Sequence, residues 1–170
     1  MDLLETVENW ALPKAQEILS IPQDFRTRYL AALRHLYPQL PRQIIHRDPN
    51  PGNIILDDEG KWGFIDFDLS ERNVRIYDPC YAATAILSET FSDPTKRSNW
   101  FRVYRDIVTG YDSVAQLTEA ERESIPWVIL TNQLICVAWF AEQEKYPEML
   151  ETNKQMTRWL LTHFDELRLP

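Results

Sequence analysis

The densest group of polar residues in this 170-residue chain lies between positions 46 and 68 and contains His46, Asp48, Asn53, Asp66 and Asp68. Asp48 follows a hydrophobic run and lies in a proline-stiffened loop, where a carboxylate can act as a base or orient an attacking hydroxyl. Asn53 and Asp66 offer the neutral and anionic oxygen ligands that Mg²⁺ accepts alongside substrate phosphates. The pattern therefore indicates metal-assisted chemistry.

Asp68 is a further candidate metal ligand because it lies two positions after Asp66. If both residues lie on one strand, their side chains face the same way, about 7 Å apart. Two like charges at that separation repel by roughly 2 to 3 kcal/mol at an effective dielectric near 20, and a divalent cation would reverse the sign. The alternative interpretation of the pair is a solvated strand end.

Three short β-rich runs must position these residues. The runs cover residues 43–46, 53–56 and 61–67, and residues 57–60 form the turn between the last two. We expect the last two runs to form a β-hairpin that brings Asn53, and Asp66 at the end of its strand, to the same cation.

Helical periodicity dominates on both sides of this β-insert. We expect helices over 3–11, after Asp24, from Asp78, from an N-cap at Ser98 to Gly110, at the Thr118/Glu121 capping box, from Pro126 and from Pro147. The predicted fold class is α+β, predominantly helical, with one small β-hairpin insert, in a single domain over residues 1–170.

The net charge of −8 argues against a nucleic-acid partner and against an anionic membrane surface, and favours a cationic small molecule. The alternative interpretation of this acidity is solubility alone. The acidic N-terminal residues do not suit a signal peptide, and the longest apolar run, residues 134–141, is short for a membrane span. We therefore expect a cytoplasmic protein in which Cys80 and Cys136 are buried thiols.

Only four glycines occur, at Gly52, Gly60, Gly63 and Gly110, and their spacing forms neither GxGxxG nor GxxxxGKS. Other groups would have to hold the phosphates of a nucleotide.

The run 44–68 resembles the catalytic core of the aminoglycoside phosphotransferase and choline kinase superfamily, small-molecule kinases with a protein-kinase-like fold. His46 to Asn53 is similar to their catalytic loop, and residues 65–68 are similar to their metal-binding segment. The resemblance implies that Asp48 is the catalytic aspartate facing the acceptor hydroxyl. It also implies that Asn53 and Asp66 bind the Mg²⁺ of MgATP.

Residues 77–83 are similar to the segment that opens the family's first long helix after the metal site. The resemblance implies that His46 and Asp78 are structural supports of the catalytic loop. The chain departs from the family at Ala82, where an aspartate is frequent, at Arg47, where glycine is frequent, and at Pro49 and Asn50, where an apolar residue and a histidine are more usual. Ala82 implies that one support under the loop is missing or replaced.

In this family an N-terminal β-rich lobe, with a phosphate-covering loop and a strand lysine, holds the nucleotide. Lys14 is the only lysine before Gln43, and it lies between expected helices. The resemblance therefore implies a C-terminal catalytic lobe alone, with the missing N-terminal lobe as a partner in cis or in trans.

The function expected from this resemblance is ATP- and Mg²⁺-dependent transfer of a γ-phosphoryl group to the hydroxyl of a small molecule, with the isolated lobe inactive. The acidic net charge favours a cationic acceptor, and uncharged sugars and other hydroxyl compounds remain alternatives. The sequence identifies no acceptor-binding residues. One alternative is a truncated or degenerate kinase-like protein that acts as a binding or regulatory module without turnover. Another is a metal-dependent hydrolase that uses the same carboxylates.

Overall fold

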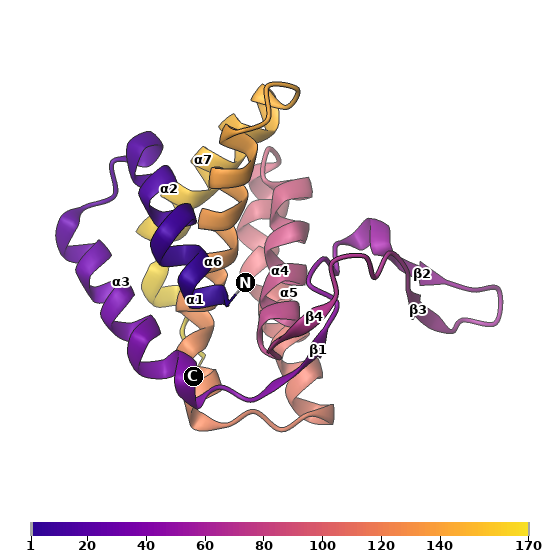
Figure 1. Ribbon diagram of the computed structural model, residues 1–170. Coiled ribbons are helices and arrows are strands. Elements are labelled where there is room, and N and C mark those ends of the chain that lie inside the picture. Colours follow the sequence, from indigo (N-terminus) through magenta and orange to yellow (C-terminus); the bar gives the residue numbers. More distant parts are fainter. Residues whose placement is uncertain (1, 170) are drawn as a thin grey trace. The chain divides into compact units, whose positions relative to one another are not determined.

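A computed structural model describes residues 2–169, and the chain divides into two compact units. Unit 1 combines the segment that ends at Leu40 with the segment that begins at Leu117, and unit 2 is Pro41–Gln116. Helices predominate and the strands are few and short, which confirms the predicted α+β class (Figure 1).

Unit 1 is helical. Its elements are α1 (Leu3–Thr6), a π-helical turn (Val7–Ala11), α2 (Leu12–Leu19), α3 (Gln23–Leu36), a 3₁₀ turn (Tyr37–Gln39), α6 (Glu119–Ala141), α7 (Pro147–Thr162) and a second 3₁₀ turn (Phe164–Leu167). Helix α6 forms the core and packs against α2, α3 and α7. Tyr29 of α3 and Thr131 of α6 share a buried 2.6 Å hydrogen bond between their hydroxyl groups. Burial raises the pKa of Tyr29 above its ordinary value, so this phenol stays neutral.

Among the described residues, α6 is the one helix long and apolar enough to cross a membrane by length and composition. Within its most apolar 18-residue window, 67% is buried inside the protein, which is typical of a core helix. Cys136, on this helix, is only partly buried, so the predicted burial of both thiols is confirmed for Cys80 alone.

Unit 2 contains the described strands. Its elements are β1 (Arg42–Ile45), a 3₁₀ turn (Pro51–Asn53), β2 (Ile54–Leu56), β3 (Trp62–Phe64), β4 (Glu71–Val74), α4 (Tyr77–Thr90) and α5 (Pro94–Val114). Strands β1 and β4 pair antiparallel, with Ile45 opposite Glu71, and β2 and β3 form a separate antiparallel hairpin, with Ile54 opposite Phe64. Helix α4 packs against α5, where the indole N–H of Trp100 donates to the Ala83 carbonyl at 2.7 Å.

Two predicted helix starts are wrong. Helix α5 begins at Pro94 because Asp93 caps it, accepting the N–H groups of Thr95 and Lys96, and it continues past Ser98 and Gly110. Helix α6 begins at the predicted Thr118/Glu121 capping box, which is confirmed, and Pro126 lies inside it. An interior glycine, such as Gly110 in α5, costs a helix about 1 kcal/mol, and an interior proline, such as Pro126 in α6, costs about 3 kcal/mol. The burial of α6 offsets the cost of its proline.

The third β-rich run was expected to reach Phe67, but strand β3 ends at Phe64. Asp66 has a φ of +63°, in the left-handed region, and a residue in that conformation cannot continue a strand. The premise that Asp66 and Asp68 lie on one strand and face the same way is therefore wrong. Strand β4 was not predicted, because Glu71-Arg72-Asn73 lacks β-forming residues.

Candidate functional site

The loop that follows β1 is anchored by Asp78, in the first turn of α4. One carboxylate oxygen of Asp78 accepts the backbone N–H of His46 at 2.8 Å, and the other accepts that of Arg47 at 2.9 Å. Asp78 therefore supports this loop. The loop keeps this support although residue 82 is alanine and not the aspartate that is frequent in the family. Burial raises the pKa of Asp78 above its ordinary value, and the two hydrogen bonds act in the opposite direction because they favour the carboxylate.

Arg47 adopts a φ of +73°, a conformation that glycine enters freely and other residues rarely adopt. Its guanidinium lies 3.4 Å from the carboxylate of Glu71, at the start of β4. The Asp78 hydrogen bond and this ion pair hold Arg47 from both its backbone and its side chain.

His46 is 6% exposed and links the loop to the segment that contains Asp66. Its Nδ1 lies 3.3 Å from the backbone N–H of Asp48, and its Nε2 lies 2.8 Å from the Ile65 carbonyl. These partners assign Nδ1 as the acceptor and Nε2–H as the donor of a neutral imidazole. The ring also lies 4.6 Å from that of Phe67.

The carboxylate of Asp48 receives hydrogen bonds from two asparagine side chains. Asn50 Nδ2 donates to Oδ1 at 2.9 Å, and Asn53 Nδ2 donates to Oδ2 at 3.1 Å. Asn53 Nδ2 also lies 2.9 Å from the Asp48 carbonyl. The orientation of the Asp48 carboxylate is thus fixed from both oxygens.

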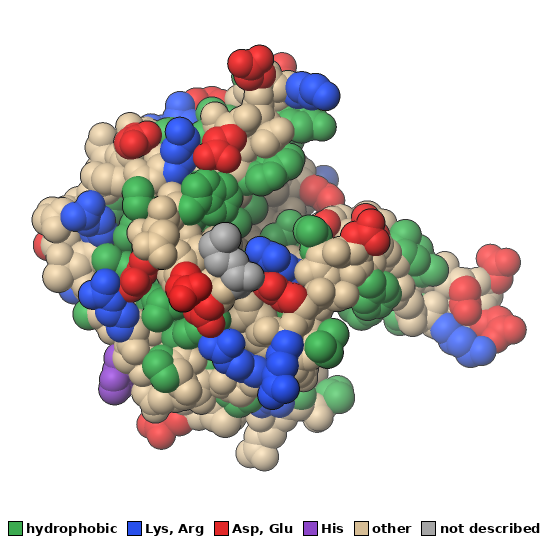
Figure 2. All heavy atoms as spheres, in the orientation of Figure 1, with side chains coloured by type: hydrophobic (Ala, Val, Ile, Leu, Met, Phe, Trp, Pro, Cys, Tyr) green, Lys and Arg blue, Asp and Glu red, His purple; other side chains and the backbone are tan. Residues whose placement is uncertain are grey.

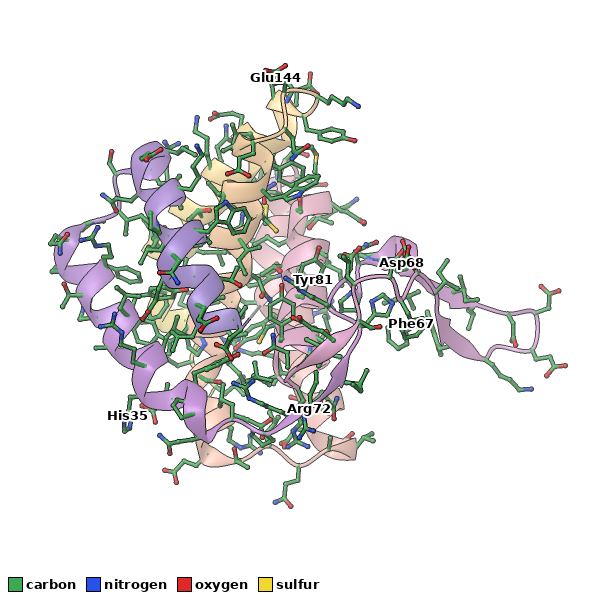
Figure 3. The ribbon with its side chains drawn as sticks, viewed as in Figure 1. His35, Phe67, Asp68, Arg72, Tyr81 and Glu144 are labelled. Carbon is green, nitrogen blue, oxygen red and sulfur yellow. The ribbon has the colours of Figure 1, made fainter. Side chains whose placement is uncertain are left out.

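Asn53 connects this loop to the second half of the predicted site. Its carbonyl accepts the backbone N–H of Ile65 at 3.0 Å, which brings the residue before Asp66 directly to Asn53. Asp66 and Asp68 are both exposed, on the segment between β3 and β4, where Figure 3 labels Phe67 and Asp68.

The oxygen types offered by Asn53 and Asp66 fit Mg²⁺, which takes few protein ligands and keeps water or phosphate oxygens. Because both donations from Asn53 use Nδ2, its Oδ1 stays available to a cation. Across residues 2–169, no cluster of three or more His, Cys, Asp or Glu side chains is arranged to hold a metal ion. A site built from this chain would therefore rely on further oxygens from water or from a substrate.

Two members of this hydrogen-bond network were not singled out from the sequence: Asn50 as a partner of Asp48, and Glu71 as a partner of Arg47. The Asn50-Pro51-Gly52 tripeptide is a turn signal, and an asparagine there commonly bonds the backbone two residues on. That signal predicts the Asn50 turn but not its second contact with Asp48. No comparable signal marks Glu71.

Large apolar side chains are exposed along the hairpin and the segments beside it. They are Ile44, Ile55, Leu56, Trp62, Phe64, Ile65, Phe67 and Leu69, with Trp62 73% exposed. Figure 2 shows hydrophobic side chains along this hairpin and charged ones at its tip. Exposed large apolar side chains gathered on one element are typical of an interaction site.

The profile of the phosphotransferase enzyme family matches residues 1–117 of the chain. A homoserine kinase from Phenylobacterium zucineum (strain HLK1) is 34% identical over 100 residues, which cover 58% of this chain and 29% of that relative. The chain thus matches less than a third of the length of this kinase. No solved structure matches the chain significantly.

Proposed function

The chain belongs to the phosphotransferase enzyme family, and from that premise we propose that it is the C-terminal, catalytic lobe of a small-molecule kinase with a protein-kinase-like fold. The proposed reaction transfers the γ-phosphoryl group of ATP to an acceptor hydroxyl. One observation carries the proposal. The side chain of Asn53 is hydrogen-bonded to the Asp48 carboxylate, and its carbonyl is hydrogen-bonded to the backbone N–H of Ile65, the residue before Asp66.

Asp48 is the proposed catalytic aspartate. A carboxylate held from both oxygens can accept the proton of an acceptor hydroxyl and keep that hydroxyl in line with the phosphoryl group. Phosphoryl transfer gains mostly from such positioning and from charge neutralisation. A rigid loop, anchored by Asp78 and His46, supplies the required positioning.

Asn53 and Asp66 are the proposed magnesium ligands, with Asp68 as a further candidate nearby. Bound Mg²⁺ would neutralise charge on the ATP phosphates. The chain supplies the Asn53 amide oxygen and the exposed Asp66 carboxylate for this role, while Asn53 keeps its contact with Asp48.

The proposed partner is an N-terminal nucleotide-binding lobe, supplied in cis or in trans. Two observations support it. The chain carries no glycine-rich phosphate loop, and the hairpin that follows Asn53 exposes the large apolar side chains of Ile55, Leu56 and Trp62. A lobe packed against this hairpin would cover them.

Homoserine is the first acceptor to test, because the related kinase is named for it. Homoserine carries a hydroxyl, an ammonium and a carboxylate group, so it is a zwitterion, and the net charge of −8 does not by itself select it. Choline and an amino sugar are the comparison acceptors, since each combines a hydroxyl with a cationic nitrogen.

The test measures acceptor phosphorylation from ATP and Mg²⁺ by the chain alone, and by the chain mixed with, or fused to, the N-terminal lobe of the homoserine kinase. We expect product only with the added lobe. Tight binding of the lobe with no product for any acceptor would favour a binding or regulatory module instead. Phosphoester hydrolysis without ATP would favour the metal-dependent hydrolase.

A further inference from the structure

The side-chain amide of Asn50 has a fixed orientation. Its Oδ1 accepts the backbone N–H of Gly52 at 2.8 Å, and its Nδ2 donates to Asp48 Oδ1 at 2.9 Å. The opposite orientation would place two donors together at Gly52 and two acceptors together at Asp48. The Asn50 amide therefore presents a donor to Asp48 and an acceptor to the turn.

Asn50 and Asn53 act on different oxygens of the same carboxylate. Each carboxylate oxygen has about two acceptor positions, so two amide donors leave room for an acceptor hydroxyl. Without Asn50, Asn53 alone would hold the carboxylate, and Asp48 could rotate about its χ2 torsion. Asn50 thus restricts the rotation that Asn53 leaves open.

We propose that Asn50 is a positioning residue for phosphoryl transfer, an inference that rests on the proposed catalytic role of Asp48. In this role Asn50 acts through Asp48, by way of the hydrogen bond to its Oδ1. The hydrogen bond from Gly52 fixes the Asn50 side chain in the turn, and the fixed side chain then supports the catalytic carboxylate.

Gly52 gives a second way to disturb this support. A Cβ at position 52 would lie 3.0 Å from Asn50 Oδ1, closer than nine in ten real Cβ contacts. Gly52→Ala would therefore shift the Asn50 amide by a few tenths of an ångström while leaving both Asp48 and Asn50 chemically unchanged.

The activity test uses the chain with its N-terminal lobe supplied and compares three substitutions at position 50. Asn50→Asp keeps the acceptor for Gly52 but places a carboxylate against Asp48, whereas Asn50→Ala removes both contacts. Asn50→His restores a donor and an acceptor. We expect kcat to fall roughly ten- to a hundred-fold in Asn50→Asp and Asn50→Ala, with KM for MgATP unchanged, and to recover to within a few-fold of wild type in Asn50→His. Gly52→Ala should lower kcat in the same direction.

A separate NMR measurement needs no turnover. The side-chain amide resonances of Asn50 are identified as those absent in Asn50→Asp, and we expect them to shift in Asp48→Ala but not in Asp58→Ala, which alters an exposed residue of the hairpin turn. Resonances unmoved by Asp48→Ala would overturn the contact itself.

The two proposals fail differently. Full activity of Asp48→Ala would overturn the proposed function. Wild-type kcat in a folded Asn50→Asp variant, together with a large loss in Asp48→Ala, would overturn only the role of Asn50.

Discussion

Asp78 accepts a 2.9 Å hydrogen bond from the backbone N–H of Arg47, a residue that the chain holds at a φ of +73°. The same carboxylate accepts the N–H of His46. A single side chain in α4 thus fixes two consecutive backbone donors immediately before Asp48. This arrangement makes the loop a rigid continuation of β1, held to the helix that follows the hairpin.

Asp78→Ala should lower the free energy of unfolding by about 2 to 3 kcal/mol, because it leaves two backbone N–H groups without their acceptor. Chemical denaturation of the purified chain measures this change. Asp106→Ala, at an exposed position of α5, is the matched control and should change stability by less than about 0.5 kcal/mol. Equal effects of the two substitutions would contradict the anchoring role of Asp78.

The raised pKa of Asp78 predicts a specific dependence of stability on pH. The ordinary value is 3.8, and the folded protein keeps the proton at pH values where the unfolded chain has released it. The stability that protonation of the Asp78 carboxyl adds, apart from its hydrogen bonds, is therefore fully present below pH 3.8 and is lost as pH rises through the raised pKa.

The Asp78→Asn variant carries an amide at this position, which does not titrate. The unfolding free energy of the wild type minus that of Asp78→Asn should accordingly fall as pH rises through this acidic window, and then stay constant towards neutral pH. A difference that grows with pH would show that the hydrogen bonds to the carboxylate outweigh its desolvation.

Arg47→Gly should be more stable than Arg47→Ala by about 1 kcal/mol. Both variants lose the ion pair with Glu71, but alanine keeps the cost of a positive φ and glycine does not. Thermal or chemical unfolding measures the difference. At ordinary backbone conformations alanine is the more stable of the two, so the reverse order would contradict the left-handed geometry of Arg47.

Asp66→Asn should weaken Mg²⁺ binding roughly ten-fold or more while the fold persists, because asparagine tolerates a positive φ but lacks the charge. Titration of the chain with Mg²⁺ in the presence of ATP and the supplied lobe, followed by NMR or calorimetry, measures the affinity. Asp58→Asn, in the hairpin turn, is the control of equal charge change. Unaltered affinity in Asp66→Asn would remove Asp66 from the proposed metal site.

Periodicity and capping signals predicted most of the helices, and the Thr118/Glu121 capping box was located correctly. The errors have two causes, a stronger local cap that was overlooked and a pairing between strands far apart in the sequence. Asp93 and Pro94 outcompete Ser98 as the start of α5, and β4 forms through pairing with β1 despite its weak propensity. Short strands of this kind are specified by their partners.

In the candidate site, too, some features could be predicted from the sequence and others could not. The spacing of Asp48, Asn53 and Asp66 was visible in the sequence as a motif. The positive φ of Arg47 and of Asp66 was not, since neither is a glycine. The contact between Asn50 and Asp48 also depends on side-chain orientation, which is set by the turn at Gly52 and is not encoded in spacing.

The most direct test of the account is the turnover of Asp48→Ala with the N-terminal lobe, ATP, Mg²⁺ and acceptor supplied, measured against wild type and against Asp58→Ala. We expect a fall in kcat on the order of a hundred-fold or more in Asp48→Ala, with its thermal unfolding still cooperative, and near-normal turnover in Asp58→Ala. Near-normal turnover of a folded Asp48→Ala variant would contradict it.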